Sequence, residues 1–140
     1  MNKPTILIAE DDFIIREGCL SPLLEREFAI VAAVDDGESA VAAVEKFKPN
    51  VVLMDVSLPV MRGFEAARLI VDAQPDTKVI FVSNYADKAC VDEAMRIGAS
   101  GYVIKSRAAT ELIPAIQAAL SGRFYSWLTD HSPSASAPNL

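Results

Sequence analysis

Short apolar runs alternate with amphipathic stretches along most of this chain. Five of the runs have the length and composition of buried strands, at residues 5–9, 29–34, 51–54, 79–82 and 101–104. After each run, apolar residues recur every three or four positions, which predicts helices at residues 13–27, 38–47, 63–73, 87–97 and 110–120. This alternation indicates right-handed βαβ units, and therefore an α/β fold whose parallel sheet is covered on both faces.

Proline and glycine refine the limits of the predicted helices. Pro22 is expected to kink or offset the first helix. Pro114 is tolerated best in a first helical turn, so we expect the last helix to begin late, near Thr110. Gly98 is expected to cap the end of the fourth helix. Five such units suit a flavodoxin-like (βα)5 doubly wound sheet with the strand order 2-1-3-4-5.

The composition is that of one globular domain followed by a polar tail. The chain has 140 residues, 51% of them apolar and 23% charged, which is enough to build a single core. We expect the domain at residues 1–125. Residues 126–140 are rich in Ser, Pro and Ala, which predicts a linker or a disordered tail.

Charge, cysteine content and hydropathy exclude several classes of protein. No apolar run approaches the roughly 20 residues that cross a bilayer, and no signal peptide is visible, so we expect a cytoplasmic protein without membrane contact. Cys19 and Cys90 lack metal or disulfide spacing and are expected to be buried free thiols. The net charge of −6 argues against nucleic acid binding by this chain, but not against a DNA-binding domain outside it.

Polar side chains follow four of the five predicted strands. Glu10 and Asp11 follow the first strand, Asp55 the third, Ser83 the fourth and Lys105 the fifth. Taken singly, each has a simpler explanation: a helix cap for the acids, a turn residue for the serine and a surface position for the lysine. In the expected strand order, however, these four strands are neighbours, and ligands of open parallel sheets bind at the carboxyl ends of the strands. The five side chains are therefore expected to meet in one cleft.

This set of side chains indicates phosphoryl chemistry with a metal ion. Three carboxylates that lie together repel one another unless a cation offsets them, and Mg²⁺ prefers carboxylate, water and phosphate oxygens. A serine hydroxyl and a lysine ammonium suit the oxygens of a phosphoryl group. A carboxylate can accept that group as a nucleophile. The chain has neither a Walker A sequence nor a G-x-G-x-x-G motif, so a nucleotide site has no anchor.

With these motifs the chain resembles a two-component response-regulator receiver domain over residues 5–125. The resemblance rests on Ile6-Leu7-Ile8-Ala9-Glu10-Asp11-Asp12, on Val52-Leu53-Met54-Asp55 and on Ala99-Ser100-Gly101-Tyr102-Val103-Ile104-Lys105. It implies that Asp55 is the phosphoacceptor. It also implies that Mg²⁺ is bound by Glu10, Asp11, Asp55 and the backbone carbonyl of Ser57.

The resemblance assigns roles to the remaining residues of the cleft. Lys105 would contact the phosphoryl group, and Ser83 and Tyr102 would form the switch, with Tyr102 packing inward after phosphorylation. The acidic pair is Glu10 and Asp11 because Arg16 stands five residues after Asp11, as the arginine of the first helix does after the second acid in the family.

Three positions near Asp55 depart from the family's usual pattern. The loop that usually runs Met-Pro-Gly-Met-Asp-Gly is Leu58-Pro59-Val60-Met61-Arg62-Gly63 here. Val60 and Arg62 thus replace a glycine and an aspartate, which bears on the shape and charge of the loop. Asn84 follows Ser83 where a small residue is usual.

The resemblance implies a signalling protein that is not itself an enzyme. Its partner would be a sensor histidine kinase or phosphotransfer protein, because His131, the only histidine, lies in the polar tail. Phosphorylation would alter the face formed by the fourth helix, the fifth strand and the fifth helix, and could produce a homodimer there. The segment 119–126 resembles receivers that precede a LuxR-type helix-turn-helix, which indicates control of transcription.

Two other functions stay open at the level of sequence. The chain could be a stand-alone receiver that docks onto proteins, with or without phosphorylation. It could also be an aspartate-nucleophile phosphohydrolase, although such enzymes need a second acid two residues after the nucleophile. Ser57 occupies that position here and is a poor general acid.

Overall fold

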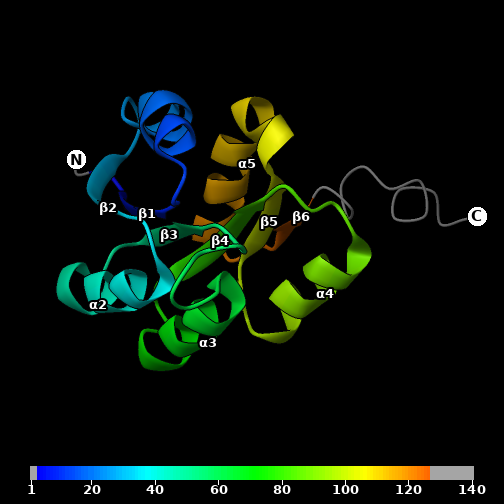
Figure 1. Ribbon diagram of the computed structural model, residues 1–140. Coiled ribbons are helices and arrows are strands. Elements are labelled where there is room, and N and C mark those ends of the chain that lie inside the picture. Colours follow the sequence, from blue (N-terminus) through cyan, green and yellow to red (C-terminus); the bar gives the residue numbers. More distant parts are fainter. Residues whose placement is uncertain (1–2, 127–140) are drawn as a thin grey trace, which may run out of the picture.

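A six-stranded parallel sheet forms the centre of the molecule (Figure 1). The computed structural model describes residues 3–126. The strands are β1 (Thr5–Ala9), β2 (Ala29–Val34), β3 (Val51–Met54), β4 (Lys78–Ser83), β5 (Gly101–Ile104) and β6 (Tyr125–Ser126), in the order β2-β1-β3-β4-β5-β6. The predicted α/β class and the predicted order of the first five strands are therefore confirmed.

The sixth strand was not predicted. Tyr125 and Ser126 pair in parallel with Gly101 and Tyr102, and the Tyr125 N–H donates to the Ser100 carbonyl oxygen at 3.3 Å. Ser126 is fully buried in this strand. Two residues are too few for a periodic pattern, so only the neighbouring edge of β5 makes them a strand. The predicted tail at 126–140, including His131, otherwise lies outside the described residues.

Helices cover both faces of the sheet (Figure 1). On one face lie α2 (Gly37–Phe47), α3 (Gly63–Ala73) and α4 (Lys88–Arg96). On the other lie α5 (Ala108–Leu120) and the first helix, which consists of the π-helical segment η1 (Ile14–Leu20) and the short α1 (Ser21–Leu24). A 3₁₀ turn, η2 (Lys105–Arg107), leads from β5 into α5.

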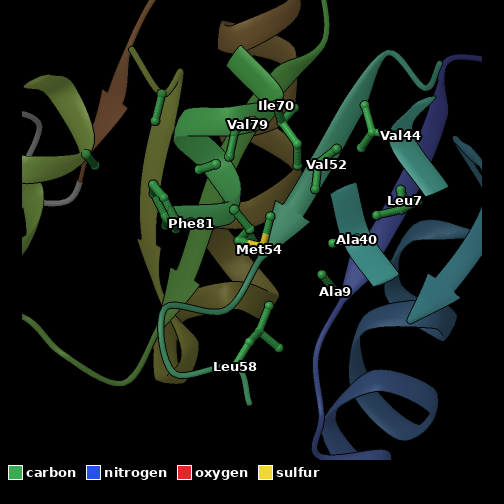
Figure 2. Close-up of a cluster of buried hydrophobic side chains, with 14 of the residues drawn as sticks. Leu7, Ala9, Ala40, Val44, Val52, Met54, Leu58, Ile70, Val79 and Phe81 are labelled. Atoms are coloured by element: carbon green, nitrogen blue, oxygen red, sulfur yellow. The ribbon is translucent and has the colours of Figure 1, made fainter. Parts of the chain in front are cut away.

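Strand residues alternate between two apolar cores because successive side chains point to opposite faces. Leu7, Val52 and Phe81 pack beneath α2, α3 and α4 (Figure 2). Ile8, Leu53 and Ile80 pack against the first helix and α5. Because both faces are buried, the strands are continuous apolar runs, and their first polar residues stand at the strand ends.

Two helix limits differ from the prediction. The first helix ends at Leu24 and changes from π to α geometry at Ser21, where Pro22 occupies the first turn of α1, so the predicted offset takes the form of a change in helix type within a continuous helix. The prediction that the last helix begins late, near Thr110, is wrong. α5 begins at Ala108, and Pro114 lies in its interior. Burial of Leu112 and Ile116, both 0% exposed, offsets the backbone hydrogen bond that Pro114 cannot make.

Three smaller expectations can also be compared with the structure. Gly98 adopts a left-handed φ of 91° one residue beyond Ile97, the residue that closes α4, as expected for a helix cap. Both cysteines are free thiols, but the prediction that they are buried is wrong for Cys19, which is exposed, and Cys90 is half-buried. None of the helices in the described part of the chain is long and apolar enough to cross a membrane.

Candidate functional site

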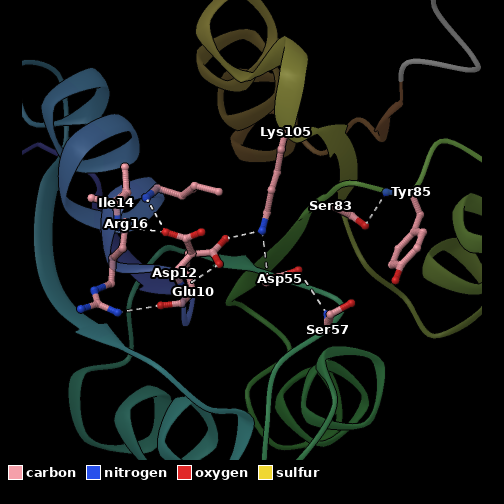
Figure 3. Close-up of polar contacts among 10 residues, drawn as sticks. Glu10, Asp12, Ile14, Arg16, Asp55, Ser57, Ser83, Tyr85 and Lys105 are labelled. Atoms are coloured by element: carbon pink, nitrogen blue, oxygen red, sulfur yellow. Dashed lines mark hydrogen bonds and ion pairs between the residues drawn. The ribbon is translucent and has the colours of Figure 1, made fainter.

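Asp55, Glu10 and Lys105 meet at the carboxyl end of the sheet (Figure 3). Asp55 directly follows β3, Glu10 follows β1 and Lys105 follows β5. The Lys105 Nζ donates to Asp55 Oδ2 at 3.0 Å and lies 2.8 Å from Glu10 Oε1. All three side chains are at least nine-tenths buried. The topology of the sheet thus assembles groups that are up to 95 positions apart in sequence, from Glu10 to Lys105.

Three carboxylates form a group with the spacing of a metal site. One oxygen each of Glu10, Asp11 and Asp55 lies within 4.8 Å of the others. Glu10 and Asp55 are buried, whereas Asp11 is exposed. Glu10 Oε1 is also buried without a hydrogen bond, since its close contact with Lys105 Nζ lacks hydrogen-bond geometry. An all-oxygen donor set of this kind fits a hard divalent cation such as Mg²⁺.

In this site one ammonium, that of Lys105, is shared by two carboxylates, those of Glu10 and Asp55. Burial, reinforced by the charge of Asp55, raises the pKa of Glu10 above its ordinary value despite the adjacent Lys105 ammonium and the hydrogen bond from the Asp12 N–H. Burial alone would lower the pKa of Lys105, but the Glu10 and Asp55 carboxylates outweigh it and raise that pKa. Lys105 is therefore charged, and the cleft retains an excess of negative charge that an added cation would offset.

Asp12, the third acid of the first acidic run, has a different role from its neighbours. Its Oδ1 accepts hydrogen bonds from the N–H groups of Ile14 and Ile15, at 2.9 and 3.2 Å, at the start of the first helix. Its own N–H donates to Glu10 Oε2 at 3.1 Å. The helix cap considered for Glu10 and Asp11 is thus Asp12, and the structure brings Glu10 and Asp11 to Asp55, as expected.

The loop after β3 wraps closely around Asp55. The Ser57 N–H donates to Asp55 Oδ1 at 3.1 Å, which holds the carboxylate from the side opposite Lys105 (Figure 3). Gly63 ends the loop, and a Cβ there would overlap the backbone carbonyl of Asp55. Val60 is 79% exposed and adopts a φ of 68°, the left-handed conformation that a glycine takes more easily.

The side chains of Ser83 and Tyr102 both form hydrogen bonds with the backbone of Tyr85. Ser83 Oγ accepts a hydrogen bond from the Tyr85 N–H at 3.0 Å, and Tyr102 Oη donates to the Tyr85 carbonyl oxygen at 2.8 Å. Both side chains are buried, and burial raises the pKa of Tyr102. The inward position of Tyr102 expected after phosphorylation is therefore already present in this conformation. Asn84 and Arg62 are both exposed.

Three further residues shape the backbone around this site, and sequence reasoning assigned them no role. Tyr85 connects Ser83 and Tyr102 through its backbone, and no side-chain pattern could have revealed this. Asp12 could have been recognised as a cap, because an Asp two or three residues before the first helical N–H groups is a common start signal. Gly63 stands directly before a helical pattern, but its close approach to Asp55 depends on the fold.

The comparisons with known proteins agree with this geometry. The family model of the response regulator receiver domain matches residues 6–117. The chain belongs to the response-regulator receiver family. It is 41% identical over 125 residues to the transcriptional regulatory protein DegU of Brevibacillus brevis, covering 89% of this chain and 53% of that protein. It is 36% identical to the transcriptional regulatory protein LnrK of Bacillus subtilis strain 168, covering 84% of this chain and 54% of that one.

Solved receiver structures share the fold. A LuxR-family two-component response regulator from Aurantimonas sp. SI85-9A1 aligns with a TM-score of 0.83 and 32% identity, covering 96% of this chain and 94% of that one. The signal receiver domain of the putative response regulator NarL from Mycobacterium tuberculosis aligns with a TM-score of 0.81 and 28% identity. The alignment covers 88% of this chain and 100% of that one. The receiver spans about half the length of the curated relatives it matches.

Proposed function

We propose that this receiver accepts a phosphoryl group on Asp55 from a phosphohistidine of a sensor histidine kinase or phosphotransfer protein. The observation that carries the proposal is the contact of Lys105 Nζ with Asp55 Oδ2 at 3.0 Å, beside the carboxylates of Glu10 and Asp11. A buried nucleophile with an adjacent cation and a metal-binding donor set is what transfer to a carboxylate requires.

The transfer would exchange one bond at phosphorus for another. A carboxylate oxygen of Asp55 attacks phosphorus, the P–O bond forms, and the P–N bond to the donor imidazole breaks with its electron pair returning to nitrogen. Lys105 would then shift from the Asp55 carboxylate to a phosphoryl oxygen, keeping its charge near the transferred group. This role requires the ammonium form, which the raised pKa of Lys105 supports.

Mg²⁺ is the proposed cofactor. Glu10, Asp11, Asp55 and the Ser57 carbonyl would hold it, and when bound it offsets negative charge on the transferring phosphoryl group. Phosphohydrolases with an aspartate nucleophile need an acid two residues later, and Ser57 there offers only a backbone N–H to Asp55. The receiver is therefore proposed to act without substrate turnover other than its own dephosphorylation.

The proposed output passes through Ser83 and Tyr102. Phosphorylation adds a charge of nearly −2, which would draw the Ser83 hydroxyl toward Asp55 and away from the Tyr85 N–H. Tyr85 is also held by Tyr102, so the segment before α4 would respond to that movement. For complete switching, phosphorylation must favour the active state over the inactive state by about 5.5 kcal/mol.

We further propose that the altered face of α4, β5 and α5 controls transcription, through homodimerisation or a DNA-binding domain outside this chain. The relatives DegU and LnrK are transcriptional regulatory proteins about twice as long as the match. Nucleic acid contact by the receiver itself is not part of the proposal, given its net charge of −6. The cytoplasm is the proposed location.

Intact mass after incubation with acetyl phosphate and MgCl₂ tests this function. The wild type should gain one phosphoryl group, and neither Asp55→Asn nor the wild type with a chelator should gain it. A beryllofluoride complex in an unmodified wild type would indicate fast hydrolysis of the acyl phosphate. A folded wild type that takes up neither group would refute the proposal in favour of a phosphorylation-independent docking module, and turnover of a generic phosphomonoester would favour a phosphohydrolase.

A further inference from the structure

Glu10 occupies the position where β1 stops being part of the sheet. Its N–H still donates to the Val34 carbonyl oxygen at 3.0 Å, and the preceding carbonyl, that of Ala9, accepts the Asp55 N–H at 3.0 Å. The Glu10 carbonyl is the next acceptor along the chain, beyond the last paired residue of β1. Glu10 is 1% exposed, and a buried carbonyl requires a donor from elsewhere.

Arg16 supplies that donor. Its Nη1 donates to the Glu10 carbonyl oxygen at 2.8 Å, and Figure 3 shows the guanidinium on the side of Glu10 away from Lys105. Glu10 is consequently held at four points: by Val34 and Arg16 on its backbone, and by Lys105 and Asp12 on its carboxylate. Of these four residues, only Arg16 belongs to the first helix.

The Arg16 side chain is itself fixed in place. Only 16% of it is exposed, and its Nε forms an ion pair with Glu17 Oε2 at 3.0 Å. Its guanidinium lies over the Phe13 ring, 5.6 Å from the centroid. The Arg16 N–H donates to the Asp12 carbonyl oxygen at 2.9 Å within the first turn of the helix. The first helix is thus linked by its cap and by one side chain to the residue that ends β1.

We propose that Arg16 is a positioning residue for the metal ligands Glu10 and Asp11. By holding the Glu10 carbonyl it fixes the backbone from which both carboxylates project toward Asp55. The inference rests on the proposed magnesium site. Its physical basis is that ligands held in place before the ion arrives lose less conformational freedom on binding.

Titration of the apoprotein with MgCl₂ by isothermal calorimetry tests this role. Arg16→Met keeps the length of the apolar stem and removes the donor, and it should weaken Mg²⁺ binding about tenfold, as do changes to partners behind metal ligands. Arg16→Lys keeps a cation and an N–H donor and should recover part of the affinity. Glu17→Gln removes the negative charge of the ion-pair partner of Arg16, leaves the donor to Glu10 in place and should bind Mg²⁺ like the wild type.

The rate of phosphorylation by acetyl phosphate gives a second measurement. In Arg16→Met the Mg²⁺ concentration for half-maximal rate should rise by the same factor, while the maximal rate stays within about twofold of wild type. A general loosening of the cleft would instead lower the maximal rate. If Arg16→Met does not fold, Arg16→Gln, whose amide is too short to reach Glu10, takes its place with the same expectation.

The outcomes separate this inference from the proposed function. A wild type that binds no Mg²⁺ would refute the proposed metal site itself. A wild type that binds Mg²⁺ together with a folded Arg16→Met or Arg16→Gln of equal affinity would refute the role of Arg16 alone. Equal losses in Arg16→Met and Glu17→Gln would also refute it, because they would reflect damage to the first helix as a whole.

Discussion

At the scale of single residues, close backbone approaches shape the cleft as much as the charged groups do. Asp55 is held by Lys105 and by the Ser57 N–H, and its own carbonyl lies against Gly63 at the start of α3. In the same loop Val60 adopts a left-handed backbone conformation. Substitutions at Gly63 and Val60 can test these two features without altering a reacting group.

Gly63→Ala should destabilise the protein by about 1–3 kcal/mol, because the added methyl overlaps the Asp55 carbonyl and the loop must shift. It should also slow phosphorylation by displacing Asp55. Urea denaturation and the acetyl phosphate rate would measure the two effects. Gly18→Ala is the matched control: the nearest atom to its new Cβ is 3.8 Å away, so it should stabilise the first helix by about 0.5–1 kcal/mol. Equal stability of the two variants would contradict this account.

Val60→Asn should stabilise the protein by about 1 kcal/mol, because asparagine tolerates the left-handed region better than a β-branched residue does. Val60 is 79% exposed, so little packing is lost. Val60→Thr keeps the branched Cβ and should leave the free energy of unfolding nearly unchanged. The prediction fails if the Asn and Thr variants unfold at the same urea concentration.

At the scale of elements, caps and edges determine where helices and strands end. Asp12 caps the first helix and Asp36 caps α2, where its side chain accepts the Ser39 N–H at 2.7 Å. The change from π to α geometry between η1 and α1 occurs next to Pro22, and β6 exists because β5 offers an edge on that side. The limits of an element therefore depend on hydrogen-bonding partners as well as on apolar periodicity.

Asp36→Ala should cost about 1 kcal/mol of stability near pH 7, since α2 loses its side-chain cap. The hydrogen bond from the Ser39 N–H is the main reason why the pKa of Asp36 is lowered from its ordinary value of 3.8. A lowered pKa means that the contribution is present above the unfolded pKa and is lost as the pH falls through the folded one. The difference between wild type and Asp36→Ala should therefore shrink below a pH of 3.8.

Thermal denaturation across this pH range would check the expectation. Asp36→Asn serves as the control, because it keeps an acceptor for the Ser39 N–H and cannot ionise. Its stability relative to Asp36→Ala should be independent of pH. A wild-type advantage that persists unchanged in acid would show that the cap does not depend on the charge.

At the scale of the whole molecule, the chain carries an excess of negative charge, and part of it lies in the carboxylate cluster at the carboxyl end of the sheet. Net charge is −6, and three carboxylates share the cleft with one ammonium. A bound divalent cation would relieve this repulsion mainly in the folded state, since Asp55 is far from Glu10 and Asp11 in the unfolded chain. Binding and folding stability should therefore be linked.

Mg²⁺ at a hundred times its dissociation constant should stabilise the fold by about 2.7 kcal/mol. Melting temperature measured against MgCl₂ concentration at constant ionic strength would detect this. Asp11→Asn should lose most of the effect, whereas Asp76→Asn, which removes the same charge outside the carboxylate cluster, should keep it. Identical curves for the two variants would indicate nonspecific screening rather than a site.

The amino-acid sequence by itself determined the order of strands and helices, the parallel sheet and the five side chains at its carboxyl edge. These follow from local apolar periodicity, and parallel strands necessarily bring their carboxyl ends to one edge. The tertiary structure alone decided that Glu10 faces Lys105, that α5 continues past Pro114, that β6 joins the sheet and that Tyr102 lies inward. Each of these depends on a partner distant in sequence, which no local pattern specifies.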